Sequence, residues 1–345
     1  MKISSKEGAG GKKMQRFLDE MVISIFGHTT VGEIGLQNLD DGASFGDYII
    51  TTDGHTVQPV FFNGGNIGTL AACGTLNDVS VMGAQPLLIT CSMILQAGFQ
   101  GEDLTEIMQS MKASCDSVGA QIVAGDTKVV DDPISIYLTT TGVGTRWEGL
   151  THNLETVRET RDYPYSFVAD CGLAPGDAII VSGSIGDHGI SILNERESLP
   201  LKGDLSSDVA PVWDIVKAAL ETGGVTAMKD PTRGGLSGAL NEMSEKSGFG
   251  IYVNESDIPV CSHTFAASEI LGINPLDVAN EGKVVMGVME EYADDVLSAI
   301  QGAAYGSDAA IIGRVNEDKR VFLNTSIGTK RILDMPEGDP VPRVC

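Results

Sequence analysis

Helix and strand signals alternate along the chain, and the alternation runs twice. In the first half, short apolar or β-branched stretches predict strands at 48–52, 87–95, 121–124 and 134–144. Apolar residues at three- and four-residue steps predict helices at 14–25, 66–82 and 103–117. After residue 165 the pattern restarts, with strands expected at 178–182, 250–253, 283–288 and 309–315 and helices at 187 onward, 212–220, 234–246, 262–271 and 291–300. This alternation favours an α/β (α+β) fold of two domains.

The domain boundaries follow from changes in composition. We expect an N-terminal domain over 1–150 and a C-terminal α+β domain over 165–334, joined by a charged and polar linker or exposed hairpin at 145–165. Three prolines among the last ten residues exclude a helix there, and favour an extended arm. Residues 335–345 are therefore predicted to form a flexible tail that carries Cys345 at its end.

Charge and cysteine content limit the class of protein. With 23 Lys and Arg against 47 Asp and Glu, the net charge is −24, which argues against nucleic acid or an anionic membrane as partner. A small polyanion is not excluded, because a metal ion or backbone amides can hold it. No apolar run approaches membrane-span length. The six cysteines form no C-x-x-C pair, which fits a reducing cytoplasm. We expect all but Cys345 to lie in the core.

Acidic residues recur beside glycines or at the edges of predicted elements. Carboxylates of this kind suit Mg²⁺, which bridges protein oxygens to nucleotide phosphates. The members of this set are Asp41, Asp53, Asp78 and Asp126. Just before the first predicted helix, the glycine-rich loop of Gly8, Gly10 and Gly11 could present backbone amides to phosphate. Taken alone, each aspartate is better explained as a simple turn former, and no P-loop motif is present.

Two further motifs carry candidate chemistry. Asp230 and Arg233 lie on a turn that leads into a helix, where they could contact phosphate or serve as a cap and a solvated cation. Glu281 precedes an apolar strand and could be a base or a surface turn residue. Cys345 could be an accidental terminal thiol, but its position on a proline-stiffened arm favours a functional role.

Taken together, these motifs resemble a known family. Residues 51–86, 124–128, 230–235 and 280–283 and the C-terminal Pro-Arg-Val-Cys occur in the order typical of the HypE family of hydrogenase maturation proteins. That family lies in the superfamily of aminoimidazole ribonucleotide synthetase, thiamine monophosphate kinase and selenophosphate synthetase. The aspartate and glycine motifs are common to the superfamily and imply ATP use, whereas the terminal cysteine motif is specific to HypE. Glu7 replaces the histidine common in relatives, so only the backbone role of the glycine loop is carried over.

The resemblance implies a reaction and a set of partners. The expected activity is ATP-dependent dehydration of an S-carbamoyl group on Cys345 to a thiocyanate, which supplies the cyano ligand for the iron of [NiFe]-hydrogenase. The carbamoyltransferase HypF would load the thiol, and the HypC–HypD complex would accept the cyano group. The N-terminal strands of two copies are expected to pair into a barrel in a homodimer.

The resemblance also implies roles for individual residues. Glu281 would act as the base and Lys128 as a cation or proton shuttle, with Cys345 carrying the reacting group. Mg²⁺ would be held by Asp41, Asp53, Asp78 and Asp126, although Asp40 could replace Asp41. The residues expected to bind ATP are Gly8, Gly10, Gly11, Asp53, Asp78, Asp126, Asp230 and Arg233.

Three other functions fit parts of the pattern. A small-molecule ATP-dependent kinase or synthetase of the same superfamily is the nearest alternative, and the terminal cysteine argues against it. A carrier that delivers a one-carbon group without using ATP would need no set of carboxylates. A scaffold protein is least favoured, because the acidic and glycine-rich pattern then has no purpose.

Overall fold

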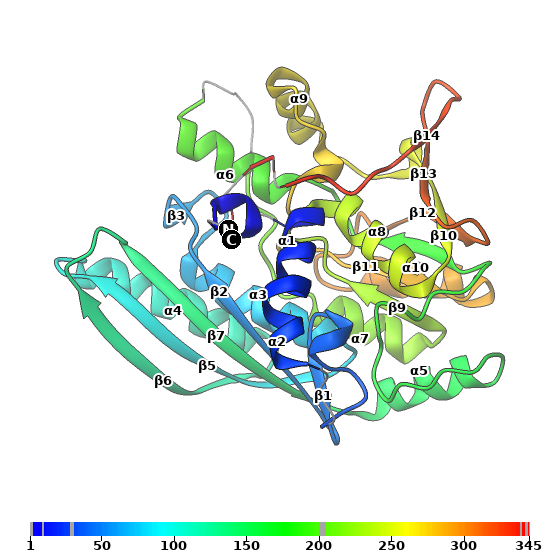
Figure 1. The fold of residues 1–345 in the computed structure, drawn as a ribbon, viewed down its shortest axis with the longest axis horizontal. Coiled ribbons are helices and arrows are strands. Elements are labelled where there is room, and N and C mark those ends of the chain that lie inside the picture. The colour runs from blue at the N-terminus through cyan, green and yellow to red at the C-terminus, as the bar shows by residue number, and fades with distance from the viewer. Residues whose placement is uncertain are drawn as a thin grey trace.

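The computed structural model describes residues 3–8, 10–27, 31–199, 205–338, 340, 341 and 344. Within them, one five-stranded sheet has the order β1-β2-β7-β5-β6 and one seven-stranded sheet has the order β14-β13-β10-β12-β8-β11-β9 (Figure 1). A short hairpin pairs β3 (Phe61–Phe62) with β4 (Gly65–Asn66). This arrangement confirms the predicted α/β (α+β) class.

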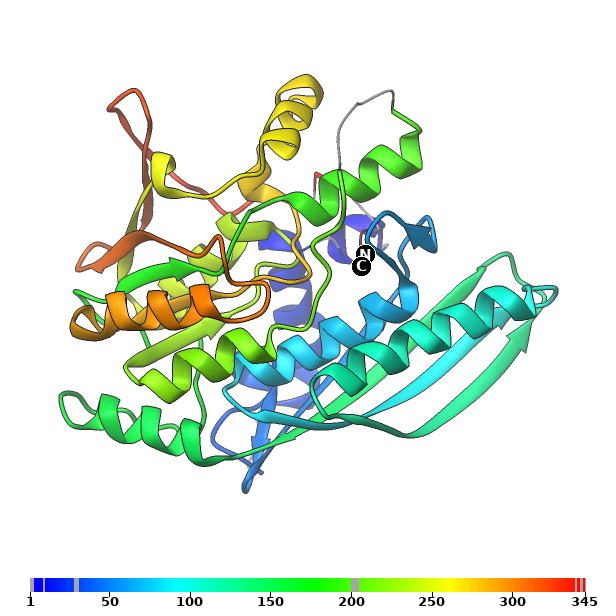
Figure 2. The same ribbon diagram turned by 180° about the vertical axis from the view of Figure 1, so that it is seen from behind.

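The five-stranded sheet is covered by helices on one face only. Its strands are β1 (Ala43–Phe45), β2 (Tyr48–His55), β5 (Gln85–Gln96), β6 (Gln121–Val130) and β7 (Ile136–Thr145). Helices α3 (Ile67–Val81) and α4 (Gly101–Ser117) lie against one face (Figure 2). Side chains alternate along the strands, so that Ile49 is buried while Tyr48 and Ile50 are exposed. Leu87, Ile94 and Tyr137 are exposed as well, which leaves an apolar surface on this sheet.

The seven-stranded sheet has a core on both faces. Its strands are β8 (Ala178–Val181), β9 (Val225–Lys229), β10 (Gly250–Asn254), β11 (Val285–Val288), β12 (Ala310–Asn316), β13 (Val321–Asn324) and β14 (Lys330–Ile332). Ile180 packs with residues of α7 (Trp213–Thr222) and α10 (Ala293–Gly302). Ile179 and Val181 pack with residues of α8 (Gly235–Ser247). Because both faces are covered, β8, β9 and β11 are buried throughout.

The remaining helices lie around these two sheets. The N-terminal helical segment comprises η1 (Ser5–Gly8), α1 (Gly11–Leu18), η2 (Asp19–Ile23) and α2 (Ser24–Phe26). Helices α6 (Asp187–Glu197) and α9 (Ser262–Leu271) lie beside one another in both views (Figures 1 and 2). Short helical turns occur at η3 (Leu36–Asn38), η4 (Glu255–Asp257), η5 (Pro275–Asp277) and η6 (Glu290–Tyr292). No helix among the described residues is long and apolar enough to cross a membrane.

The predicted linker at 145–165 is wrong. The structure has helix α5 (Glu148–Arg158) there, and Leu150, Leu154 and Val157 on it are fully or almost fully buried. These three residues are spaced four and three apart, which places them on one face of a helix. Strand β9 was also not predicted, and β6 extends beyond the expected 121–124. The domain boundaries at 150 and 165 stay a prediction.

The cysteines and the tail differ in part from expectation. Cys73, Cys91 and Cys115 are buried, whereas Cys171 and Cys261 are half-buried. Cys345 lies outside the described residues. Val341 and Val344 are buried in the hydrophobic cluster that contains Ile190 of α6. These described tail residues therefore lie against the body of the protein rather than in solvent.

Candidate active site

A cavity of about 480 Å³ lies where the N-terminal segment, the five-stranded sheet and the seven-stranded sheet meet. The residues that line it come from several of the segments that carried a motif. Gly10 and Gly11 contribute from the start of α1, Asp53 from β2 and Asp78 from α3. Asp41, Lys229, Asp230, Arg233 and Glu281 also line it. The fold thus brings together most of the candidate residues that the sequence indicated.

The carboxyl groups of this cavity lie close together, and some of their buried oxygens have no hydrogen-bond partner among the described residues. Burial raises the pKa of Asp230 to about 8, and the neighbouring Asp41 contributes to that shift. Burial, reinforced by Asp230, raises the pKa of Glu281 and of Asp78 well above the ordinary values. Among the described residues, Asp41 Oδ2, Asp230 Oδ2 and Glu281 Oε1 are buried without a hydrogen-bond partner. The cavity therefore favours a positively charged ligand, or protons in its place.

These features fit a nucleotide that arrives with Mg²⁺. The unpartnered oxygens of Asp41 and Asp230 could accept a metal or its bound water. No three His, Cys, Asp or Glu side chains of the described residues are close enough to hold a metal by themselves. Mg²⁺ commonly keeps several waters and takes the rest of its ligands from substrate phosphates.

Two glycines bring the backbone close to this cavity. Gly10 and Gly11 have φ angles of +72° and +67°, which disfavour other residues. A Cβ at Gly11 would lie 2.2 Å from the carbonyl oxygen of Pro336, so the N-terminal loop and the start of the tail are in close contact. Backbone N–H groups at the start of α1 are available for phosphate. Gly8 lies in η1 and does not line the cavity.

A buried ion-pair network forms one wall. Lys229 Nζ lies 2.6 Å from Asp41 Oδ1, 3.3 Å from Glu242 Oε2 and 3.7 Å from Asp170 Oδ2. Although burial opposes the charge, Asp41 and the other acids hold the pKa of Lys229 well above its ordinary value. Asp40 also lines the cavity, and burial and Asp170 raise its pKa. Of the two adjacent aspartates, Asp41 is the one with a free oxygen.

Besides Gly8, two described residues of the predicted site lie elsewhere in this single chain. Asp126 and Lys128 project from β6, where their side chains are 61% and 64% exposed and form an ion pair of 2.7 Å. Neither lines the cavity. Arg233 does line it, with Nη2 at 3.9 Å from Asp53 Oδ1.

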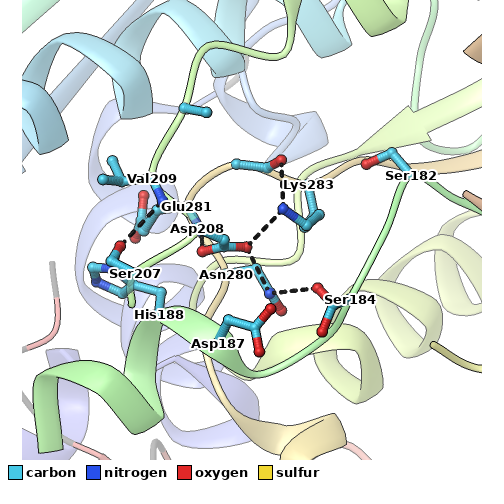
Figure 3. A network of polar contacts seen from close by, with 12 residues as sticks. Ser182, Ser184, Asp187, His188, Ser207, Asp208, Val209, Asn280, Glu281 and Lys283 are labelled. Atoms are coloured by element: carbon cyan, nitrogen blue, oxygen red, sulfur yellow. Dashed lines mark hydrogen bonds and ion pairs between the residues drawn. The ribbon is translucent and has the colours of Figure 1, made fainter. Parts of the chain in front are cut away.

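Sequence reasoning missed the residues that hold Glu281 in position. The backbone N–H of Glu281 donates to Asp208 Oδ1 at 3.0 Å, and the amide of Asn280 donates to Asp208 Oδ2 at 2.8 Å (Figure 3). Lys283 Nζ lies 3.3 Å from the same oxygen. Asn77 Nδ2 donates to the carbonyl oxygen of Glu281 at 3.1 Å. Asn77 lies next to Asp78 within the motif at 51–86, so its position there could have indicated it. Asp208 lies in no motif, and no sequence pattern pointed to it.

Comparison with known proteins defines the class and then the family. The chain matches AIR synthase related protein, N-terminal domain, over residues 39–145 and the corresponding C-terminal domain over residues 174–325. The carbamoyl dehydratase HypE of Rhizobium leguminosarum bv. viciae is 39% identical, over 100% of this chain and 95% of the relative.

Two solved structures show the same similarity. A HypE–HypF complex contains a chain that is 40% identical, with a TM-score of 0.84 over 92% of this chain and 99% of that one. A structure of hydrogenase maturation protein HypE in complex with ATP is 33% identical, with a TM-score of 0.79 over all of both chains. The fold is thus that of an AIR synthase related protein. Within that class, the chain belongs to the HypE family of carbamoyl dehydratases.

Proposed function

We propose that this protein is an ATP-dependent carbamoyl dehydratase of hydrogenase maturation, which converts an S-carbamoyl group on Cys345 into a thiocyanate. The observation that carries the proposal is the position of the tail. Val344, the residue before Cys345, is buried and contacts His188, whose other ring nitrogen contacts Ser207, the chain neighbour of the Asp208 that accepts from the N–H of Glu281. The cyano group formed is destined for the iron of [NiFe]-hydrogenase.

The chemistry explains why ATP and a buried base are needed together. The amide oxygen of a thiocarboxamide is a poor leaving group, and transfer of the γ-phosphoryl group to it makes the C–O bond easy to break. Thiocarboxamide and ATP give thiocyanate, ADP and phosphate, so the oxygen leaves with phosphate and the nitrogen loses both of its protons. Glu281 is the proposed acceptor of a proton, because it lines the cavity and its Oε1 is buried there without a hydrogen-bond partner among the described residues.

The proposed ATP site is the acidic cavity. Asp41, Asp53, Asp78 and Asp230 would hold Mg²⁺ and ATP, and Arg233 would approach the phosphates. The metal would neutralise charge on the phosphates during transfer. Backbone amides at Gly10 and Gly11 would bind phosphate oxygens without adding further charge.

A homodimer would complete this site. Strand β6 is exposed along almost its whole length, and the uncovered face of its sheet carries Tyr48, Ile50, Ile94 and Tyr137. An exposed edge strand and an apolar sheet face together favour pairing with a second copy. Strands from two copies would then close a barrel. In that assembly the Asp126 and Lys128 of one copy would face the cavity of the other, which accounts for their position away from their own.

The proposed partners follow from the reaction. A carbamoyltransferase of the HypF type would load Cys345, and the structure of a related HypE with HypF supports this contact. The HypC–HypD complex would accept the cyano group. We place these steps in the cytoplasm, where the thiol stays reduced. A small-molecule kinase of the same superfamily is not favoured, because it would have no use for a C-terminal cysteine.

Replacement of the terminal thiol tests the proposal. Cys345→Ser should still bind ATP but accept no carbamoyl group from HypF and carbamoyl phosphate, as measured by intact mass. Cys261→Ser, which removes a half-buried thiol, should be loaded like the wild-type protein. Carbamoylation of the Cys345→Ser protein would show that another group carries the substrate.

A further inference from the structure

His188 contacts the tail directly, and no motif pointed to it. It lies in the first turn of α6, and its side chain is fully buried. Its Nε2 is 2.8 Å from the carbonyl oxygen of Val344, and its Nδ1 is 2.7 Å from Ser207 Oγ. The ring of Phe62 packs nearly perpendicular to it, with centroids 5.7 Å apart. The buried imidazole thus links the first turn of α6 to Val344 near the C-terminal end of the chain.

The direction of each hydrogen bond can be assigned. A carbonyl oxygen only accepts, so Nε2 must carry the proton that is donated to Val344. Burial lowers the pKa of His188, which keeps the ring neutral, and Nδ1 is then an acceptor for the hydroxyl of Ser207. Ser207 Oγ in turn accepts from the N–H of Val209 at 3.1 Å. Every donor in this series points toward the tail, so the ring is fixed in one tautomer.

The same loop connects His188 to Glu281. Ser207 and Asp208 are neighbours in the chain, and Asp208 accepts from the backbone N–H of Glu281 at 3.0 Å. Figure 3 shows His188, Ser207, Asp208 and Glu281 gathered around this loop. A shift of His188 would therefore be transmitted to the proposed base through only two intervening residues.

Apolar packing stabilises the tail against the protein but does not fix its position along the direction of the chain. Val341 and Val344 are buried with Phe62, Ile190 and Val209. Such contacts are non-directional and tolerate sliding. The hydrogen bond from His188 to one named carbonyl oxygen is directional, and it is what can fix the register of the last residues.

We propose that His188 is a positioning residue for the reaction: its Nε2–H holds the Val344 carbonyl oxygen and so sets where the modified C-terminal residue lies relative to Glu281. The proposal rests on the proposed dehydratase function for its consequence in catalysis. Its structural part, retention of the tail by the His188 donor, is independent of that function.

A matched set of variants tests retention of the tail. The amide nitrogen of His188→Gln can reach the position of Nε2, whereas that of His188→Asn reaches only that of Nδ1. The measurement is the rate at which carboxypeptidase Y removes C-terminal residues from the unmodified protein, followed by intact mass. Cleavage requires the tail to leave its site, so the rate reports the undocked fraction.

Loss of one neutral hydrogen bond should raise the undocked fraction of the tail about tenfold. We expect His188→Ala and His188→Asn to be trimmed about ten times faster than wild type, His188→Gln within about threefold of it, and the exposed control His263→Ala at the wild-type rate. Should the alanine variant fail to fold, the glutamine and asparagine pair decides. Equal trimming of the asparagine variant and wild type, or equal trimming of the glutamine and asparagine variants, would overturn the proposal.

A second measurement separates positioning from general damage. In a single turnover of preloaded protein, the asparagine variant should dehydrate the carbamoyl group about tenfold more slowly, with an unchanged ATP concentration for half-maximal rate. The glutamine variant should recover most of the rate. A weaker affinity for ATP with an unchanged maximal rate would exclude a positioning role. Absence of dehydration in the wild-type protein would reject the proposed function and leave the trimming result valid.

Discussion

At the scale of single residues, the cavity is marked by acidic side chains, and among the described residues Asp41, Asp230 and Glu281 each have one buried oxygen without a hydrogen-bond partner. The sequence indicated Asp53, Asp78, Asp230 and Glu281 as candidates, and the structure gathers them around one cavity. The sequence could not indicate how these acids are protonated, because the pKa of Asp230 depends on its burial and on Asp41, which is far away in the chain. His188 was missed for the same reason, since its partner Val344 lies 156 residues away.

The raised pKa of Asp230 predicts how stability depends on pH. The folded protein without ligand keeps a proton on Asp230 up to about pH 8, whereas the unfolded chain releases it above its ordinary value of 3.8. The folded state therefore binds more protons between these values, and this group makes stability fall as pH rises from about 4 to 8. Asp230→Asn removes that contribution.

Thermal unfolding measured from pH 5 to pH 8 checks this expectation. The melting temperature of Asp230→Asn minus that of wild type should increase across this range. Asp308→Asn, at an exposed position, should show a constant difference. A difference for Asp230→Asn that does not change with pH would mean that this carboxyl group is already ionised.

Glu281 allows a second test at this scale. Glu281→Gln keeps the shape of the side chain and removes its capacity to accept a proton. We expect single-turnover dehydration of preloaded protein to slow by at least about 100-fold, as for loss of a general base. Carbamoylation of Cys345 and the melting temperature should not fall, and Glu221→Gln serves as the surface control. Dehydration at the wild-type rate in the glutamine variant would remove Glu281 from the mechanism.

At the scale of elements, prediction succeeded where the apolar pattern was strong. The strands at 48–52 and 87–95 and the helices at 66–82 and 103–117 were found near their observed positions. Helix α5 was missed because charged residues around Leu150, Leu154 and Val157 concealed a narrow apolar stripe. The predicted strand at 121–124 was shorter than β6 because the second half of β6 contains polar residues and is exposed, as is typical of an edge strand.

The exposure of β6 predicts its role in assembly. Val129 is 64% exposed on this strand, and a lysine there would place a charge in the proposed interface. Sedimentation velocity should show wild type at twice the 36.3 kDa of one chain and Val129→Lys mainly at that mass. Ile327→Lys, at a more exposed position on another part of the surface, should stay dimeric. A monomeric wild-type protein, or a dimeric Val129→Lys protein, would contradict the proposed barrel.

At the scale of the whole molecule, the two sheets share one hydrophobic core. Ile49 and Met82 from the first part of the chain pack in the same cluster as Ile180 and Met286 from the second. Composition suggested a boundary between domains but could not reveal this shared core, which depends on long-range contacts. Asn77 reinforces it, since its side chain bonds the carbonyl oxygens of Ala210 and Glu281 and the N–H of Val212.

Asn77→Ala should therefore destabilise the entire protein. It removes three buried hydrogen bonds and leaves the N–H of Val212 without that partner, which should lower the free energy of unfolding by about 3 kcal/mol. Urea unfolding followed by circular dichroism measures the change. Thr222→Ala, which loses one bond within α7, should cost less than half as much. An unchanged free energy of unfolding for Asn77→Ala would show that apolar packing alone joins the two parts.

The central claim is that the chain dehydrates a carbamoyl group carried on its own C-terminal cysteine. Its most direct test is the intact mass of the protein over time with HypF, carbamoyl phosphate, ATP and Mg²⁺. The account predicts a gain of one carbamoyl group, followed by an ATP-dependent loss of one water, with both changes mapped to Cys345. ATP consumption without any change in mass at Cys345 would contradict it and would favour a small-molecule kinase or synthetase built on the same fold.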